Sequence, residues 1–164
     1  MKNIDKCSER VCKALEFATQ KHDGQYRVGG LPYITHPVSV AEMLEKKGFG
    51  EEYIISALFH DLLEDTDATE EEILALGGER VLDSVKLLTK REGYNMAEYI
   101  GKIKKDPIAF AVKGADRLHN LLCAVECNDN FKRRYISEST EWFMDFNEDI
   151  PLAVDRLKKS LNSK

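Results

Sequence analysis

The sequence lacks several features that define whole classes of protein. No apolar run approaches the roughly 20 residues of a membrane-spanning helix, and the first residues lack the apolar core of a signal peptide. Basic residues are too few for a nucleic-acid-binding surface, because 24 Lys and Arg stand against 29 Asp and Glu. These absences predict a cytoplasmic protein with no nucleic-acid partner and no membrane partner. They leave the oligomeric state open.

Cysteine is also scarce. The four cysteines, Cys7, Cys12, Cys123 and Cys127, form no Cys-x-x-Cys pair, and disulfides are rare in the cytosol. Cys123 and Cys127 are four residues apart in a predicted helix, a spacing that suits zinc ligands or small buried side chains, and we favour the second. The sequence leaves open whether Cys7 and Cys12 meet.

What remains is a helical pattern. The 164 residues are 43% hydrophobic and 32% charged, which is typical of a globular protein, and we expect a single domain over residues 1–164. Nearly every segment has helical periodicity and none alternates, so the fold class is all-α. The pattern predicts helices over about 4–21, 37–47, 51–65, 70–76, 79–89, 95–104 and 107–125, and two more in the tail 130–162. Pro37 is expected at a first helical position, with His36 as the N-cap.

The central feature is the stretch Ala-Leu-Phe-His-Asp-Leu-Leu-Glu-Asp-Thr at residues 57–66. In one continuous helix His60 and Glu64 share a face, and Asp61 and Asp65 share the adjacent face. Buried carboxylates are costly unless they are paired, hydrogen-bonded or bound to a metal. We therefore expect a divalent-metal site with a catalytic carboxylate beside it. An exposed acidic patch is the alternative, which the helix dipole disfavours.

Three further segments carry candidate site residues. Arg27 lies in a Gly-rich loop over residues 22–33, where it is either solvated or a phosphate ligand. Lys113, Asp116 and Asn120 line one face of a predicted helix, and a salt bridge from Asp116 to Lys113 is the simpler explanation of this acid. The basic cluster at 131–135 most simply forms a solvated face.

Together these residues predict phosphate chemistry. His36, His60, Asp61 and Asp116 offer mixed nitrogen and oxygen ligands for manganese, iron, zinc or cobalt. Such an ion makes hydroxide available near neutral pH and polarises a phosphoryl oxygen. Glu64 is placed to position or deprotonate the water, with Asp65 assisting, while Arg27, Lys113 and Asn120 can contact the substrate.

The same residues resemble a known family. His36, His60-Asp61 and Asp116 match the H…HD…D signature of the HD superfamily of metal-dependent phosphohydrolases. The match is closer to the hydrolase domain of RelA/SpoT enzymes and to stand-alone small alarmone hydrolases. Four stretches carry it: His-Asp-Gly-Gln-Tyr-Arg at 22–27, Pro-Tyr-Ile-Thr-His-Pro at 32–37, His-Asp-Leu-Leu-Glu-Asp-Thr at 60–66 and Lys-Gly-Ala-Asp-Arg-Leu-His-Asn at 113–120.

The resemblance implies a compact, all-α, multi-helix HD-domain bundle with manganese as the metal, and removal of the 3′-pyrophosphate from ppGpp and pppGpp. It implies His36, His60, Asp61 and Asp116 as metal ligands, Glu64 with Asp65 as the pair acting on water, and Arg27 and Asn120 as substrate contacts.

Two positions depart from the family pattern. Val28 follows Arg27 where the family usually has lysine, and Cys123 stands where it tends to have a threonine near the nucleotide base. These departures keep open another substrate, a nucleoside monophosphate or an NADPH-like nucleotide. A non-catalytic nucleotide sensor is the remaining alternative, and it is disfavoured because a sensor has no need of Glu64 beside a metal.

Overall fold

The computed structural model describes residues 7–161, and every regular element in that range is helical. Within these residues β pairing is limited to one isolated antiparallel bridge between Tyr26 and Pro32. The all-α prediction is therefore confirmed. None of the helices in this part of the chain combines the length and the apolar character that crossing a bilayer requires.

The chain divides into two compact units, which we call the N-terminal unit (residues up to Val112) and the C-terminal unit (residues from Lys113). The single domain expected over residues 1–164 stays a prediction. The N-terminal unit holds α1 (Glu9–Lys21), α2 (Thr35–Lys46), α3 (Glu51–Phe59), α4 (Leu62–Asp65), α5 (Glu70–Gly77), α6 (Glu79–Leu88) and α7 (Met96–Ile103). The unit boundary falls inside α8 (Pro107–Cys123), and η2 (Ala124–Glu126), α9 (Asp129–Trp142) and α10 (Ile150–Leu161) follow it.

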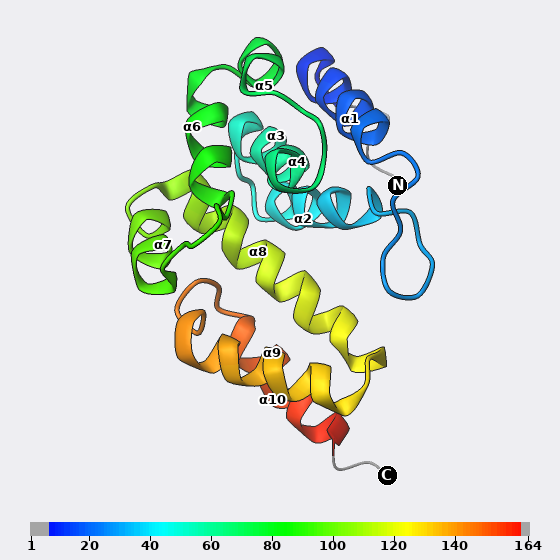
Figure 1. Cartoon of the computed structure of the whole chain (residues 1–164), viewed down its shortest axis with the longest axis vertical. Coiled ribbons are helices and arrows are strands. Elements are labelled where there is room, and N and C mark those ends of the chain that lie inside the picture. The colour runs from blue at the N-terminus through cyan, green and yellow to red at the C-terminus, as the bar shows by residue number, and fades with distance from the viewer. Residues whose placement is uncertain (1–6, 162–164) are drawn as a thin grey trace. The chain divides into compact units, whose positions relative to one another are not determined.

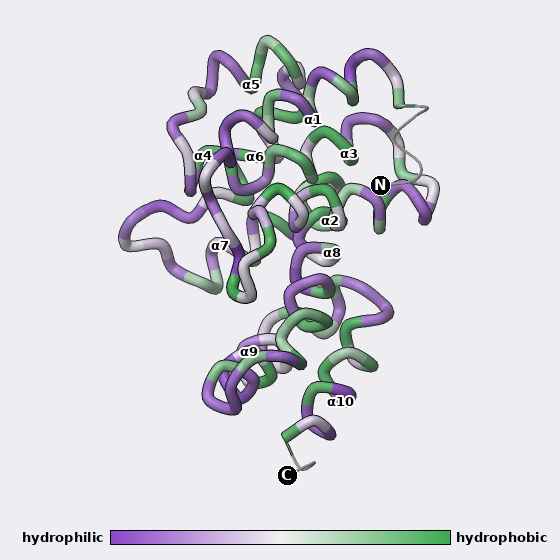
Figure 2. Tube along the Cα trace, turned by 90° about the vertical axis from the view of Figure 1, so that its right-hand side faces the viewer, coloured by the Kyte–Doolittle hydropathy of each residue, from purple (hydrophilic) through white to green (hydrophobic). Residues whose placement is uncertain are grey.

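Helix α3 is the centre of the N-terminal unit. It packs against α1, α2, α5 and α6, which lie around it in Figure 1. Apolar residues dominate it in the hydropathy colouring of Figure 2, and Ile55 and Phe59 are fully buried. The ring of Phe17 on α1 meets Phe59 edge-on, with the centroids 5.7 Å apart. Because α3 is held on several sides, the residues at its end are held as well.

Side chains cap the starts of three helices. Thr69 and Glu72 form a capping box at α5, and the Asn95 side chain accepts a hydrogen bond from the backbone N–H of Glu98 at the start of α7. Asp106 accepts from the backbone N–H of Ala109 at 2.7 Å and so caps α8. These local signals could be read from the sequence because each bond joins residues three apart.

The predicted start of the second helix was wrong. Helix α2 begins at Thr35, so His36 is its second residue and not its N-cap, and Pro37 follows inside the first turn. Proline is tolerated there because the first four backbone N–H groups of a helix have no helical partner. Thr35 Oγ1 donates to the carbonyl of Pro32 at 2.7 Å, which stabilises the earlier start.

Aromatic residues form the core of the C-terminal unit. Phe143 and Phe146 are buried, and their rings meet edge-on with the centroids 5.3 Å apart. The guanidinium of Arg117 lies 4.1 Å from the centroid of Phe143 and donates to Glu138 at 2.6 Å. Burial of Arg117 is therefore compensated by an ion pair and a ring contact.

At Gly114, α8 lies close to the backbone of Phe146 in the same unit. A Cβ atom at this position would lie 2.6 Å from the carbonyl oxygen of Phe146. We expect Gly114→Ala to destabilise the protein by about 1–3 kcal/mol in urea unfolding, despite the better helix propensity of alanine. Gly101→Ala is the matched control, since a Cβ there meets nothing within 4 Å, and it should be neutral or stabilising. Equal stability of the two variants would contradict this packing.

Candidate metal centre

The site begins where α3 ends. The continuous helix predicted over residues 51–65 was wrong, because α3 stops at Phe59 and α4 starts at Leu62. The His60 ring nitrogen Nδ1 lies 2.7 Å from the carbonyl oxygen of Ala57. In an unbroken helix that carbonyl would accept from the backbone N–H of Asp61. The imidazole takes its place, and His60 and Asp61 therefore occupy the junction between two helices rather than a regular turn.

The bond to Ala57 fixes the chemistry of the His60 ring. A carbonyl oxygen only accepts, so Nδ1 must carry the proton and Nε2 is left as the ligand atom of the neutral ring. Nε2 of His60 lies 3.0 Å from Oδ2 of Asp61, and Nε2 of His36 lies 3.8 Å from the same oxygen. Two imidazole nitrogens and a carboxylate oxygen thus face one point, and His36 and His60 are almost completely buried.

Tyr33 supports this point from the loop before α2. Its hydroxyl donates to Oδ2 of Asp61 at 2.7 Å, and its ring meets His36 edge-on with the centroids 6.0 Å apart. Sequence reasoning gave Tyr33 no role. The available signal was its spacing, three residues before His36, which places both side chains near one side of the helix start.

Glu64 and Asp65 follow on α4. Oε2 of Glu64 accepts from the backbone N–H of Lys90 at 2.8 Å, so the connection between α6 and α7 orients this carboxylate. Partial burial, followed by the negative charges of Asp61 and Glu64, raises the pKa of the Asp65 carboxyl. An acid with a raised pKa is the more basic carboxylate once ionised, which suits a role in proton transfer.

Gln25 was also missed by the sequence analysis. Its Nε2 donates to the backbone carbonyl of Asp65 at 2.7 Å, and its Oε1 lies 2.8 Å from Nδ1 of the buried His22. The side chain therefore ties the end of α1 to the end of α4. No local sequence pattern predicts this contact, because Gln25 and Asp65 are 40 positions apart.

The predicted loop over residues 22–33 is ordered. Arg27 donates its backbone N–H to the carbonyl of Leu31 at 2.8 Å, and Gly29 and Gly30 form the turn with φ of +104° and +86°. The Arg27 guanidinium lies 6.0 Å from the centroid of the Tyr33 ring, on the residue that contacts Asp61. Val28 stands at the tip with 89% of its surface exposed. Arg27 thus lies near Tyr33, which bonds to Asp61, whereas Val28 is exposed to solvent.

In the C-terminal unit, α8 carries the remaining candidates. Asp116 is 6% exposed, and both of its oxygens are bonded. Lys113 donates to Oδ2 at 2.8 Å and Asn120 donates to Oδ1 at 2.7 Å. The salt bridge to Lys113 named above as the simpler explanation is therefore present.

The histidines and Asp61 fit a divalent ion. Two neutral imidazole nitrogens with a carboxylate oxygen are ligands for manganese, iron, zinc or cobalt. The carbonyl of Ala57 holds the His60 ring by its other nitrogen, which is the usual outer-shell support of a metal-binding histidine.

The HD domain family matches residues 14–146 of the chain. The chain belongs to the HD domain family. The resemblance read from the four sequence stretches is confirmed, and it covers both the junction at His60-Asp61 and the segment around Asp116.

Named relatives of this HD domain are enzymes of guanosine tetraphosphate metabolism. It is 37% identical over 142 residues to the guanosine-3′,5′-bis(diphosphate) 3′-pyrophosphohydrolase of Aquifex aeolicus, an alignment that covers 82% of the chain. It is 34% identical over 144 residues to the bifunctional (p)ppGpp synthase/hydrolase SpoT of Escherichia coli, covering 81% of the chain. The chain spans only 20% of the length of each of these two relatives.

A solved structure shares the fold. A metazoan ortholog of SpoT that hydrolyses ppGpp superimposes with a TM-score of 0.77 at 24% sequence identity. The match covers 94% of this HD domain and 97% of that chain. The all-helical arrangement is therefore that of the HD family over almost the whole chain.

Proposed function

We propose that this HD domain is a metal-dependent hydrolase that removes the 3′-pyrophosphate from ppGpp and pppGpp. One observation carries the proposal: His36, His60 and Asp61 direct two imidazole nitrogens and a carboxylate oxygen to one buried point. The choice of ppGpp as the substrate is based on the relatives named above, which act on this nucleotide.

The proposed ligands are His36, His60, Asp61 and Asp116, with manganese as the ion. His36, His60 and Asp116 are buried residues of types that hold divalent metals. The fourth proposed ligand, Asp61, is taken from the HD signature. When bound, the ion supplies an activated water and an electrophile for a phosphoryl oxygen. Tyr33 and Ala57 keep Asp61 and His60 in place through the hydrogen bonds described above.

Glu64 and Asp65 are the proposed pair acting on the attacking water. Glu64 is held by the Lys90 N–H on one oxygen, which leaves its other oxygen to orient the water or accept its proton. Asp65, whose carboxyl pKa is raised by partial burial and by the charges of Asp61 and Glu64, is the proposed second proton acceptor.

The substrate contacts are proposed at Arg27, Lys113 and Asn120. The guanidinium of Arg27 is a planar fork that suits a phosphate, and it lies 6.0 Å from the ring of Tyr33, whose hydroxyl bonds to Asp61. Lys113 and Asn120 already orient the carboxylate of Asp116, so each would serve both this acid and the nucleotide.

Val28 is uncharged where the family usually has lysine, so we expect this chain to bind the phosphates of its substrate more weakly. We expect Val28→Lys to lower KM for ppGpp by about 3–10-fold with kcat nearly unchanged, because one added charge near the phosphates contributes about 1 kcal/mol in a partly exposed site. The exposed position of Val28 makes the change harmless to the fold. Lys47→Ala, which removes a charge at the C-terminal end of α2, serves as the control for a change in net charge away from the loop. A KM that is equal in wild type and Val28→Lys would exclude Val28 from the phosphate site.

A second nucleotide substrate is the alternative, because Val28 lacks the expected charge and Cys123 replaces a base-contacting threonine. Cys123 is exposed, and its Sγ lies 3.7 Å from Nε2 of His119. Comparing kcat/KM for ppGpp, GTP, GMP and NADPH separates the two. The highest kcat/KM with ppGpp would support alarmone hydrolysis. The highest kcat/KM with GMP or NADPH would identify that nucleotide as the substrate instead. Turnover of any of them excludes a non-catalytic sensor.

A further inference from the structure

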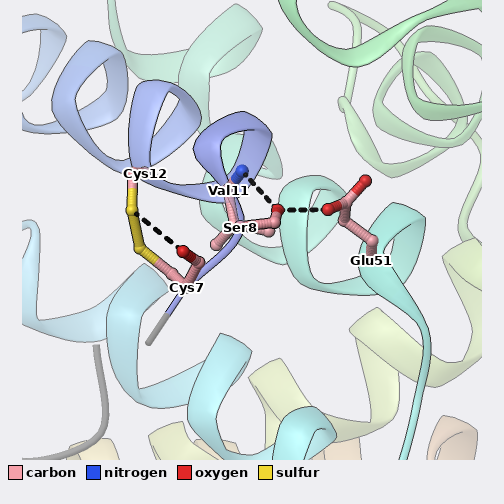
Figure 3. Close-up of a disulfide and its surroundings, with 5 residues drawn as sticks. All are labelled: Cys7, Ser8, Val11, Cys12 and Glu51. Carbon is pink, nitrogen blue, oxygen red and sulfur yellow. Dashed lines mark hydrogen bonds between the residues drawn. A yellow bond between two sulfur atoms is a disulfide. The ribbon is translucent and has the colours of Figure 1, made fainter. Parts of the chain in front are cut away.

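Cys7 and Cys12 form a disulfide at the start of α1 (Figure 3). Their Cα atoms are 5.8 Å apart, within the range that a disulfide bridges without moving the backbone. The bond closes a ring around Ser8, the N-cap of α1. Cys123 and Cys127 remain thiols. The two pairs therefore differ in kind, and the first pair is not explained by the metal centre.

The ring encloses the contacts that fasten α1 to the rest of the N-terminal unit. Ser8 accepts from the backbone N–H of Val11 at 3.2 Å and donates to Oε1 of Glu51, as Figure 3 shows. Arg10, also inside the ring, pairs with Oε2 of Glu51 at 3.1 Å and donates to the carbonyl of Gly77. Restricting this segment therefore restricts the links from α1 to α3 and α5.

We propose that Cys7 and Cys12 are a reversible thiol–disulfide modification site that sets the stability of the α1 anchor and leaves the metal centre unchanged. The α1 anchor and the metal centre lie at opposite ends of α3. Glu51 is its first residue and His60 follows its last, about 13 Å apart at 1.5 Å per residue. The proposal is independent of the substrate proposed above.

The reduced form is accommodated as well. Sγ of Cys12 lies 3.6 Å from the backbone carbonyl of Cys7, which gives the free thiol a hydrogen-bond acceptor. Cys7 borders a small apolar hollow that includes Val11, Leu15 and Val38, where an uncharged thiol is tolerated. We therefore expect reduction to leave the fold unchanged.

The chemistry is exchange with a low-molecular-weight disulfide such as oxidised glutathione. The exposed Cys12 thiolate attacks one sulfur of that disulfide and releases one glutathione thiolate. The Cys7 thiolate then attacks the Cys12 sulfur of the mixed disulfide and releases the second. Two protein thiols are oxidised, one glutathione disulfide is reduced to two thiols, and two protons pass to the medium or to the leaving thiolates.

The oxidised form should unfold at a higher temperature. Closing a ring of about six residues restricts the unfolded chain, which for a protein of this size corresponds to a Tm shift of about 3–8 °C. We would measure Tm of the full chain in oxidised and in reduced glutathione, and count reactive thiols by alkylation and mass spectrometry. We expect two alkylated cysteines, Cys123 and Cys127, after oxidation, and four after reduction.

Variants separate this site from the other thiols. Cys7→Ser and Cys12→Ala should each abolish the Tm difference between the two glutathione states, while Cys127→Ser keeps it. The kcat and KM of wild type should be the same in both states. Four alkylated cysteines in oxidised glutathione, a lasting glutathione adduct, or a Tm difference that survives in Cys7→Ser would overturn the proposal.

Discussion

Asp61→Ala should lose bound manganese and pyrophosphate release together. Oδ2 of Asp61 is the common point of the centre, 3.0 Å from His60 and 3.8 Å from His36, and it also accepts from Tyr33. Removing it takes a carboxylate away from two buried imidazoles and removes one acceptor of the Tyr33 hydroxyl. Changes to outer-shell residues typically cost about 10–100-fold in metal affinity or activity, and loss of a ligand should cost more.

Two variants serve as controls for Asp61→Ala. Asp61→Asn keeps an oxygen for the Tyr33 hydroxyl but removes the charge, so it should fold like wild type and still bind metal weakly. Asp67→Ala removes an exposed acid that pairs with Lys21 at 3.1 Å, and it should leave metal content and rate unchanged. Metal content by elemental analysis and initial rates give both readouts. Full activity in Asp61→Ala would exclude Asp61 as a ligand.

Glu64→Gln should keep the metal and lose most of the turnover. Glutamine retains an oxygen that can accept from the backbone N–H of Lys90, so the side chain keeps its position but no longer accepts a proton. Loss of a positioned acid–base group costs about 10²–10⁴-fold in kcat. Glu64→Ala should lose at least as much, since it removes the anchor as well.

Comparing the two Glu64 variants separates positioning from proton transfer. If Glu64 only orients the water, Glu64→Gln should be far more active than Glu64→Ala, and if it accepts the proton the two should be similarly slow. Glu71→Gln, an exposed acid at the start of α5, should behave like wild type. A near-wild-type rate with normal metal content in both Glu64 variants would remove this residue from the mechanism.

Local signals explain what the sequence predicted well. The capping residues Thr69, Asn95 and Asp106 act on N–H groups three residues away, so their pattern is visible without the fold. The histidines and acids of the centre stood out because carboxylates in an apolar segment were expected to be buried and to need a partner. In the structure Asp116 is buried, whereas Glu64 and Asp65 are exposed. The resemblance to the HD family, carried by four short motifs, assigned these residues to one site.

Longer-range contacts explain what the sequence did not predict. Periodicity favoured one helix through His60, and only the bond from its ring to the Ala57 carbonyl shows why the helix breaks there. Tyr33 and Gln25 act on residues 28 and 40 positions away, and no spacing rule links such pairs. Cys123 is exposed rather than a small buried side chain, because the face of a helix that meets solvent depends on packing.

The most direct test of the account is product analysis with ppGpp. Protein stripped of metal and protein reconstituted with manganese are incubated with ppGpp, and the products are separated and quantified. The account predicts GDP and pyrophosphate in equal amounts from the manganese-loaded protein, and neither from stripped protein nor from manganese-treated Asp61→Ala. Equal rates with and without metal, or no cleavage of ppGpp by manganese-loaded protein, would contradict it.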